Sequence, residues 1–175
     1  MNTTDGNAAT GVDPRVITVL REPAARVRSL FTYIHREPDH PRHAEFSRDA
    51  VTIADVYDRV RMEPFDNHQV RYLAGPDAHA KPFGALTETD LELAKRNLET
   101  GCTAFGLQER FAESLAWFGE TLGWPGVEAG RLNTSPGSAS GFSESERRLV
   151  LGHNALDLEL YDFAQRLFAE RTGVH

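Results

Sequence analysis

The stretch from Val16 to Ile34, VITVLREPAARVRSLFTYI, decides the fold class of this chain. Five β-prone residues, Val16–Leu20, run directly into a proline-containing turn, and a pattern of helical period follows. A buried strand followed at once by a helix is the half-unit of an α/β sheet. Pro23 suits the first position of the helix, because the amide hydrogen that proline lacks would have no partner there. The stretch therefore predicts a strand and a helix joined at residues 21–23.

The two faces of this predicted helix differ in chemistry. Its apolar positions have the spacing of a core-facing stripe, and they are Val27, Leu30, Phe31 and Ile34. Arg21 comes at the carboxyl end of the strand, where open α/β sheets bind their ligands. Arg26 and Ser29 follow on the polar side of the helix. A guanidinium, a hydroxyl and the positive end of a helix in one place predict a phosphate-binding site.

The order Arg21-Glu22-Pro23, Arg26, Ser29 resembles the 3′-phosphate-binding motif of PAPS-dependent sulfotransferases, where PAPS is 3′-phosphoadenosine 5′-phosphosulfate. The motif of that family is a strand followed by Arg-Asp/Glu-Pro-x-x-Arg-x-x-Ser on the next helix. The first Arg and the Ser of the motif contact the 3′-phosphate of the nucleotide. The resemblance therefore implies that Arg21 and Ser29 bind the cofactor PAPS.

Four further segments, in the same order, are similar to carbohydrate sulfotransferases related to heparan sulfate 2-O-sulfotransferase, including bacterial members. They are HPRH at 40–43, NHQVRYLAG at 67–75, FGLQERF at 105–111 and NALDLELY at 154–161. The similarity covers roughly Pro14 to Phe168. It implies an α/β, helix-rich, partial P-loop-kinase-like sulfotransferase fold with a short parallel sheet over residues 14–175. Residues 1–13 are small and polar and are predicted to be a disordered tail.

The resemblance also implies the activity, which is transfer of a sulfonate from PAPS to a hydroxyl of a carbohydrate acceptor. It places a loop containing Asn133, Thr134 and Ser135 over the nucleotide. Such a loop offers amides and hydroxyls to phosphate, and the alternative is a solvated linker. No catalytic base is identified. A non-catalytic relative that acts as a nucleotide-binding or protein-interaction module remains the alternative function.

Three residues are candidates for binding the acceptor. Arg71 lies in the Asn-x-Gln-x-Arg element and can bind an acidic or sulfated sugar through two hydrogen bonds. The alternative for Arg71 is a structural role with buried hydrogen bonds. His40 and His43 follow the first helix and are candidates for lining the acceptor cleft.

The chain departs from the family pattern at its N-terminus. In the family, a Gly/Ser/Thr-rich loop with a Lys holds the 5′-phosphosulfate, and the basic His lies between that loop and the Arg-x-Pro strand. Only fourteen residues precede Arg15, and residues 1–11 contain no Lys, Arg or His. The sequence therefore predicts the C-terminal portion of the family fold, with an exposed strand edge beside Val16–Leu20. A homodimer or a missing N-terminal partner segment would cover that edge, and a ligand-free interaction protein assembled through it is a further alternative.

Composition limits the remaining classes of function. The net charge of −7 argues against general nucleic-acid binding. No apolar run has the length of a membrane span, and no signal peptide is visible, so we expect a cytoplasmic protein without membrane partners. The single Cys102 excludes an internal disulfide and a thiolate metal site, and its apolar surroundings predict burial. The histidines fit no common zinc spacing, so no metal is expected.

Sequence patterns predict several further elements. A second strand is expected at 103–107, a helix at 109–122 ended by Gly123, and a third strand at 127–132. Thr89 with Glu92, and Ser143 with Glu146, have the spacing of capping boxes. The capping box at Thr89 would begin a helix that ends at about residue 100. The capping box at Ser143 would begin a single long last helix, in which His153 faces inward. Residues 35–47 are predicted to be a loop, followed by a helix over about 48–61.

Overall fold

The computed structural model describes residues 15–124 and 141–173. Within them, β1 (Ile17–Leu20) and β2 (Ala104–Leu107) form a two-stranded parallel sheet. Ile17 pairs with Ala104, and Leu20 pairs with Leu107. Both strands lie where the sequence predicts them, and the α/β class is confirmed at this level.

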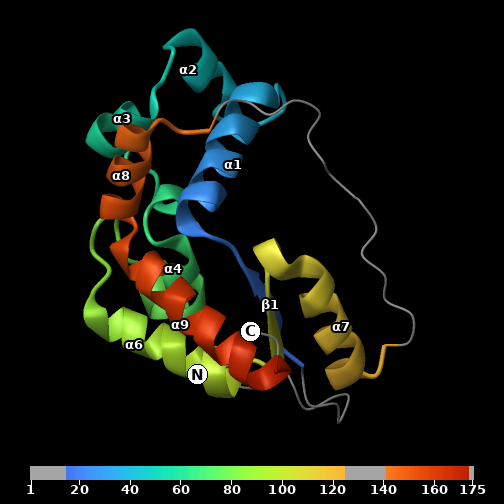
Figure 1. Cartoon of the computed structure of the whole chain (residues 1–175). Coiled ribbons are helices and arrows are strands. Elements are labelled where there is room, and N and C mark those ends of the chain that lie inside the picture. Colours follow the sequence, from blue (N-terminus) through green and yellow to red (C-terminus); the bar gives the residue numbers. More distant parts are fainter. Residues whose placement is uncertain (1–14, 125–140, 174–175) are drawn as a thin grey trace, which may run out of the picture.

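Helices surround this small sheet. The longer ones are α1 (Pro23–Arg36), α6 (Glu88–Arg96), α7 (Phe111–Leu122), α8 (Glu144–His153) and α9 (Ala155–Thr172). The shorter ones are α2 (His43–Arg48), α3 (Ile53–Asp55), α4 (His68–Leu73) and α5 (Pro76–His79). Two π-helical turns follow α3 and α6, at Val56–Val60 and Asn97–Gly101, and 3₁₀ turns occupy Glu63–Phe65 and Gln108–Arg110. In Figure 1 the sheet stands between α7 and α9, both of which contact β2.

The turn from β1 into α1 follows the sequence closely. Pro23 is the first residue of α1, and Glu22 is its N-cap. The Glu22 carboxylate accepts a hydrogen bond from Ala25 N at 2.6 Å, which satisfies one of the amides that a helix leaves unpaired at its start. Val27 and Ile34 are fully buried, so the predicted apolar stripe is confirmed.

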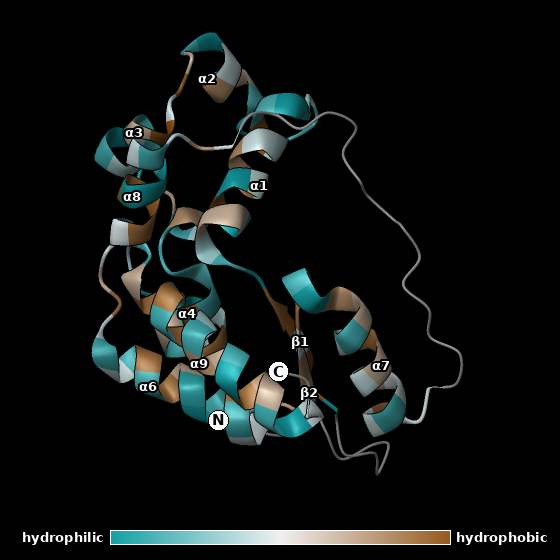
Figure 2. Cartoon of the chain, viewed as in Figure 1, coloured by the Kyte–Doolittle hydropathy of each residue, from teal (hydrophilic) through white to brown (hydrophobic). Residues whose placement is uncertain are grey.

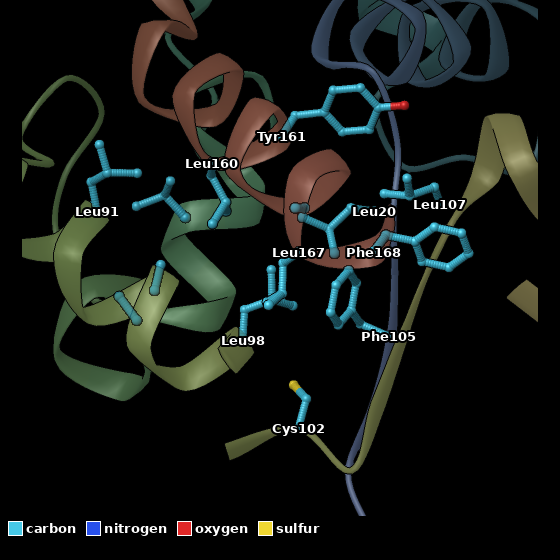
Figure 3. Close-up of a cluster of buried hydrophobic side chains, with 14 of the residues drawn as sticks. Leu20, Leu91, Leu98, Cys102, Phe105, Leu107, Leu160, Tyr161, Leu167 and Phe168 are labelled. Carbon is cyan, nitrogen blue, oxygen red and sulfur yellow. The ribbon is translucent and has the colours of Figure 1, made fainter. Parts of the chain in front are cut away.

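Three buried clusters hold the described elements together, and the smallest of them joins Ala104 of β2 to Phe118 and Leu122 of α7. Figure 3 shows the first, in which Leu20 and Phe105 from the sheet meet Leu160 and Phe168 of α9. Cys102 lies at the edge of this cluster, and the predicted burial of its side chain is confirmed. The second cluster packs α1 against Phe46 of α2 and the region of α3, with Val150 of α8. The end of β1 and the start of α1 therefore lie where the first and second clusters adjoin.

The start of α6 differs from its prediction. The capping box is formed by Thr87 and Asp90, and α6 begins at Glu88. Asp90 is held in place by Lys81, whose Nζ lies 2.7 Å from its carboxylate. Thr89 and Glu92 have the right spacing as well, but the pair with the additional tertiary contact makes the cap.

The region between α1 and α4 was predicted with the wrong boundaries. Residues 43–48 form α2 inside the predicted loop, because Phe46 is fully buried against α1. The helix predicted over 48–61 is reduced to α3 and its π-helical turn. Ala50 has a φ of 46°, a left-handed conformation that no right-handed helix can contain.

The predicted long last helix is broken at Asn154 into α8 and α9. The capping box of Ser143 and Glu146 at its start is confirmed. The Asn154 side chain accepts a hydrogen bond from Asn67 N at 2.9 Å and donates to Tyr57 Oη at 3.0 Å. His153 is exposed and stacks on Tyr57 with the ring centroids 4.2 Å apart, so its inward placement was wrong. The predicted tail and the predicted third strand lie outside the described residues.

Candidate anion-binding cleft

A cleft of about 510 Å³ runs along the edge of β1 that no described strand pairs with, on the side of α4. It is lined by residues 16–21, Arg26, His68, Gln69, Tyr72, Leu73, Cys102 and Gln108. This lining holds two arginines and, among the described residues, no Asp or Glu. On a chain with a net charge of −7, such a cleft is a local region of positive potential.

The backbone of Arg21 is fixed at the mouth of this cleft by Gln69 of α4. Arg21 N donates to Gln69 Oε1 at 2.8 Å, and Gln69 Nε2 donates to Arg21 O at 3.0 Å. The Arg21 side chain lines the cleft, and its Nε is buried without a hydrogen-bond partner. The predicted position of Arg21 at the carboxyl end of a strand is therefore confirmed, and its guanidinium can donate to a ligand.

Arg26 brings a second guanidinium to the same cleft. Its Nη2 donates to Pro64 O, while its Nε is buried without a partner. Burial lowers the pKa of Arg26, the buried carboxylate of Asp157 opposes that effect, and the charge of Arg21 adds to it. An arginine stays protonated despite such a shift. Arg21 and Arg26 therefore place two cations in the lining of the cleft, and Asp157 is not among the lining residues.

Two amides at the start of α1, one of them in its N-cap, are already used. Ala25 N donates to Glu22, and Glu22 N donates to Glu109 Oε1 at 3.0 Å. The other oxygen of Glu109 accepts a hydrogen bond from Tyr161 Oη at 2.6 Å. Because these carboxylates occupy the helix terminus, an anion in the cleft would be bound by the two guanidiniums rather than by backbone amides.

Ser29, the predicted partner of Arg21, lies elsewhere on α1. It is exposed, and it is not among the residues that line the cleft. Six residues of helix separate it from Pro23, which is roughly 9 Å along the axis. The structure thus brings Arg21 together with Arg26 and not with Ser29.

The Asn-x-Gln-x-Arg element has a structural role in this structure. Arg71 is fully buried, and its Nη2 lies 2.7 Å from Asp66 Oδ2. The carbonyls of Ala78, His79 and Lys81 accept hydrogen bonds from its Nη1. Of the two alternatives for Arg71, this geometry agrees with the buried structural role and gives a sugar no access to the side chain.

Hydrogen bonds in both directions join the first turns of α4 and α9, and we call this set of contacts the clasp. The Asp157 carboxylate accepts hydrogen bonds from Gln69 N at 3.1 Å and Val70 N at 2.8 Å. In return, Asn67 Oδ1 accepts a hydrogen bond from Asp157 N at 3.0 Å. Desolvation by complete burial raises the pKa of Asp157, and the charge of Arg26 and these backbone hydrogen bonds work against that rise. The clasp fixes Gln69, and through it the backbone of Arg21.

The remaining predicted site residues are far from the cleft or outside the described residues. His43 Nδ1 lies 3.0 Å from Ile34 O, and His40 packs its ring against Tyr33, both beyond the carboxyl half of α1. The length of α1 separates them from Arg21 by roughly 20 Å. Asn133, Thr134 and Ser135 lie in 125–140, which the structure does not describe.

His68 lines the cleft and was not among the predicted site residues. Its Nδ1 is buried without a hydrogen-bond partner, and the centroid of its ring lies 4.5 Å from the centroid of the Tyr72 ring. Burial, reinforced by the charges of Arg26 and Arg71, lowers the pKa of His68 to about 4. The imidazole is therefore neutral at neutral pH. The sequence signal for His68 as a cleft residue is its position directly before Gln69. That position points to the cleft only once the contact between Gln69 and Arg21 is known.

The lowered pKa of His68 predicts a specific loss of stability in acid. The unfolded chain, with a His pKa near 6.5, takes up the proton before the folded chain does. Stability from this residue is thus complete above pH 6.5 and is lost as the pH falls toward 4. Allowing for partial exposure, the loss is on the order of 2 kcal/mol. Urea unfolding across this pH range should show the loss of stability in wild type and not in His68→Gln. The control variant His40→Gln should lose stability in acid as wild type does.

The sequence matches no protein-family model and no characterised protein. In residues 15–124 and 141–173 there is no group of three or more His, Cys, Asp or Glu side chains arranged to hold a metal ion. No helix in that same part of the chain has both the length and the apolar character needed to cross a bilayer.

Proposed function

We propose that this protein is a relative of the PAPS-dependent sulfotransferases that binds the 3′-phosphate end of the nucleotide in the β1 cleft. The observation that carries the proposal is the pair Arg21 and Arg26, each of which has a buried Nε without a hydrogen-bond partner. Both arginines line a cleft whose described residues include no Asp or Glu. A guanidinium carries five N–H donors and a full positive charge, so two of them in one cleft favour an anionic ligand there.

The other walls of the cleft suit the rest of a nucleotide. Tyr72 is 60% exposed and presents an aromatic ring beside Leu73 and the apolar residues of β1. Aromatic rings and aliphatic side chains provide a stacking surface for a purine. A planar guanidinium matches two oxygens of a phosphate, so a phosphorylated adenosine fits both the charged end and the apolar side.

Sulfonate transfer from PAPS to a carbohydrate hydroxyl is the reaction that this family relationship implies. It needs a base on the acceptor hydroxyl and cationic groups on the departing oxygen. The histidine of the cleft, His68, is a weak base, because its pKa is lowered to about 4. That observation favours the second candidate function, a non-catalytic nucleotide-binding module.

Calorimetric titration with adenosine 3′,5′-bisphosphate tests the binding proposal. We expect wild type to bind, and Arg21→Ala to bind about 10–100-fold more weakly, because a charge-assisted hydrogen bond contributes roughly 1.5–3 kcal/mol. Arg28→Ala is the matched control. It removes the same charge from an exposed position of α1 outside the cleft and should leave the affinity unchanged.

Two further arms separate the alternatives. Adenosine 5′-monophosphate should bind much more weakly than the bisphosphate, because it lacks the 3′-phosphate. Transfer of labelled sulfonate from PAPS to a carbohydrate acceptor, lost in Arg21→Ala, would identify the transferase; binding without transfer would identify the module. Absence of binding by folded wild type would reject both.

A further inference from the structure

The backbone groups along the edge of β1 opposite β2 are a feature of the cleft that the proposed nucleotide site does not use. Val16, Ile17 and Val19 are 50%, 42% and 40% exposed, and Figure 2 shows β1 as an apolar ribbon. Within the described residues, β2 is the sole strand that pairs with β1. Such an apolar edge can pair with a further extended segment.

The backbone geometry identifies which residues of β1 face the open edge. Val16 O accepts a hydrogen bond from Thr103 N at 2.8 Å, on the side of β2. Backbone groups of successive residues in a strand point to opposite sides, so residues 18 and 20 also face β2. The amide and carbonyl groups of Ile17 and Val19 therefore point to the open edge.

At Arg21, the next residue that faces the open edge, the side chain of Gln69 satisfies the hydrogen-bonding groups of the backbone. Arg21 lies two residues beyond Val19, so its backbone points to the same side. There the primary amide of Gln69 both accepts from Arg21 N and donates to Arg21 O. This side chain takes the place that a residue of a neighbouring strand would take. An added segment can therefore pair with Ile17 and Val19 and must end where Gln69 begins.

The charges at that end favour an acidic occupant. Arg21 and Arg26 line the cleft with unpartnered Nε atoms, and no Asp or Glu is among the described residues of that lining. A second copy of the chain is disfavoured, because antiparallel pairing of two β1 strands, with Ile17 opposite Val19, sets Arg21 of each copy opposite Arg15 of the other. Two like charges would then meet at each end of the pair.

We propose that the open edge of β1 binds an extended segment of another polypeptide, with apolar side chains at alternate positions and an Asp or Glu at the end that reaches Arg21 and Arg26. Main-chain hydrogen bonds to Ile17 and Val19 supply the pairing. The carboxylate sets the direction of the segment and selects it from other apolar strands.

Fluorescence anisotropy, without nucleotide, tests this inference with a short fluorescein-labelled peptide of alternating Val and Thr residues that ends in Glu. We expect saturable binding, and binding weaker by about tenfold or more when Lys replaces Glu or when the pairing amides of the peptide are N-methylated. Val19→Lys should weaken binding equally. Tyr33→Lys, a similar change at an exposed position of α1 outside the cleft, should not.

Three results would overturn the inference: no saturable binding by folded wild type, equal affinity for the Glu and Lys peptides, or light scattering that shows a dimer abolished by Val19→Lys. The last result would assign the edge to a second copy. N-methylation leaves the protein unchanged, so a folding defect of Val19→Lys cannot imitate the effect. Titration of wild type with adenosine 3′,5′-bisphosphate separates failure at the edge from failure at the phosphate site, because nucleotide binding without peptide binding rejects the edge alone.

Discussion

Replacing Arg71 by Ala is expected to lower the free energy of unfolding by about 3–5 kcal/mol, a large part of the net stability of a domain. The guanidinium is fully buried against Asp66, which also accepts a hydrogen bond from Gly84 N at 2.8 Å. Without Arg71, the buried carboxylate loses its counter-charge, and the carbonyls of Ala78, His79 and Lys81 lose their donor. Urea unfolding followed by circular dichroism measures the loss.

Arg42→Ala is the matched control for this prediction. Arg42 forms an ion pair with Glu45 of the same 2.7 Å length, but both side chains are substantially exposed. Exposed pairs contribute roughly 0.2–1 kcal/mol, so this variant should unfold almost as wild type does. An Arg71→Ala variant of undiminished stability would contradict the structural role and reopen the alternative of an acceptor-binding arginine.

Replacing Gly106 by Ala is expected to destabilise the protein by about 1–3 kcal/mol through overpacking. A methyl group at this position of β2 would lie 2.7 Å from Ser114 Cβ and 3.1 Å from Phe118 Cζ, both on α7. Ser114 cannot easily move away, because its hydroxyl accepts from Leu107 N at 2.9 Å and donates to Arg110 O. The substitution should therefore push α7 away from the sheet, and the midpoint of chemical unfolding reports it.

Gly152→Ala makes the same chemical change with the opposite expected sign. Gly152 lies in α8, and apart from its chain neighbours and the nearby backbone of the helix itself nothing lies within 4 Å of the added methyl group. Alanine in an open helical position stabilises by roughly 0.5–1 kcal/mol relative to glycine. If Gly106→Ala behaved as Gly152→Ala does, the close contact between β2 and α7 would be refuted.

Local chemistry explains the parts of the fold that the sequence predicted well. The passage from β1 into α1 depends on a run of β-prone residues, on Pro23 and on a stripe of apolar positions, all within one short stretch. The cap of α8 by Ser143 and Glu146 likewise involves neighbours three residues apart. Such interactions are present in the chain before it folds, and their spacing can be read directly.

Local signals failed where a tertiary contact decided between near-equal choices. Thr87 rather than Thr89 begins α6, because Asp90 also binds Lys81. The break between α8 and α9 exists because the Asn154 side chain is used by Asn67, which lies 87 positions earlier. No helical pattern reports a partner at that separation.

The candidate site divides in the same way. The sequence alone determined that Arg21 would stand at the carboxyl end of a strand and ahead of a helix, because the order of β-prone, proline and amphipathic residues encodes that turn. The tertiary structure decided which groups join it: Gln69 reaches its backbone from 48 positions away, Arg26 turns into the cleft, and Ser29 does not. It also placed Arg71 in the interior, where Asp66 and the carboxyl end of α5 bind it. The physical reason is that hydrogen bonds and ion pairs of buried groups depend on which elements the core packs together, and that packing is set by the whole chain.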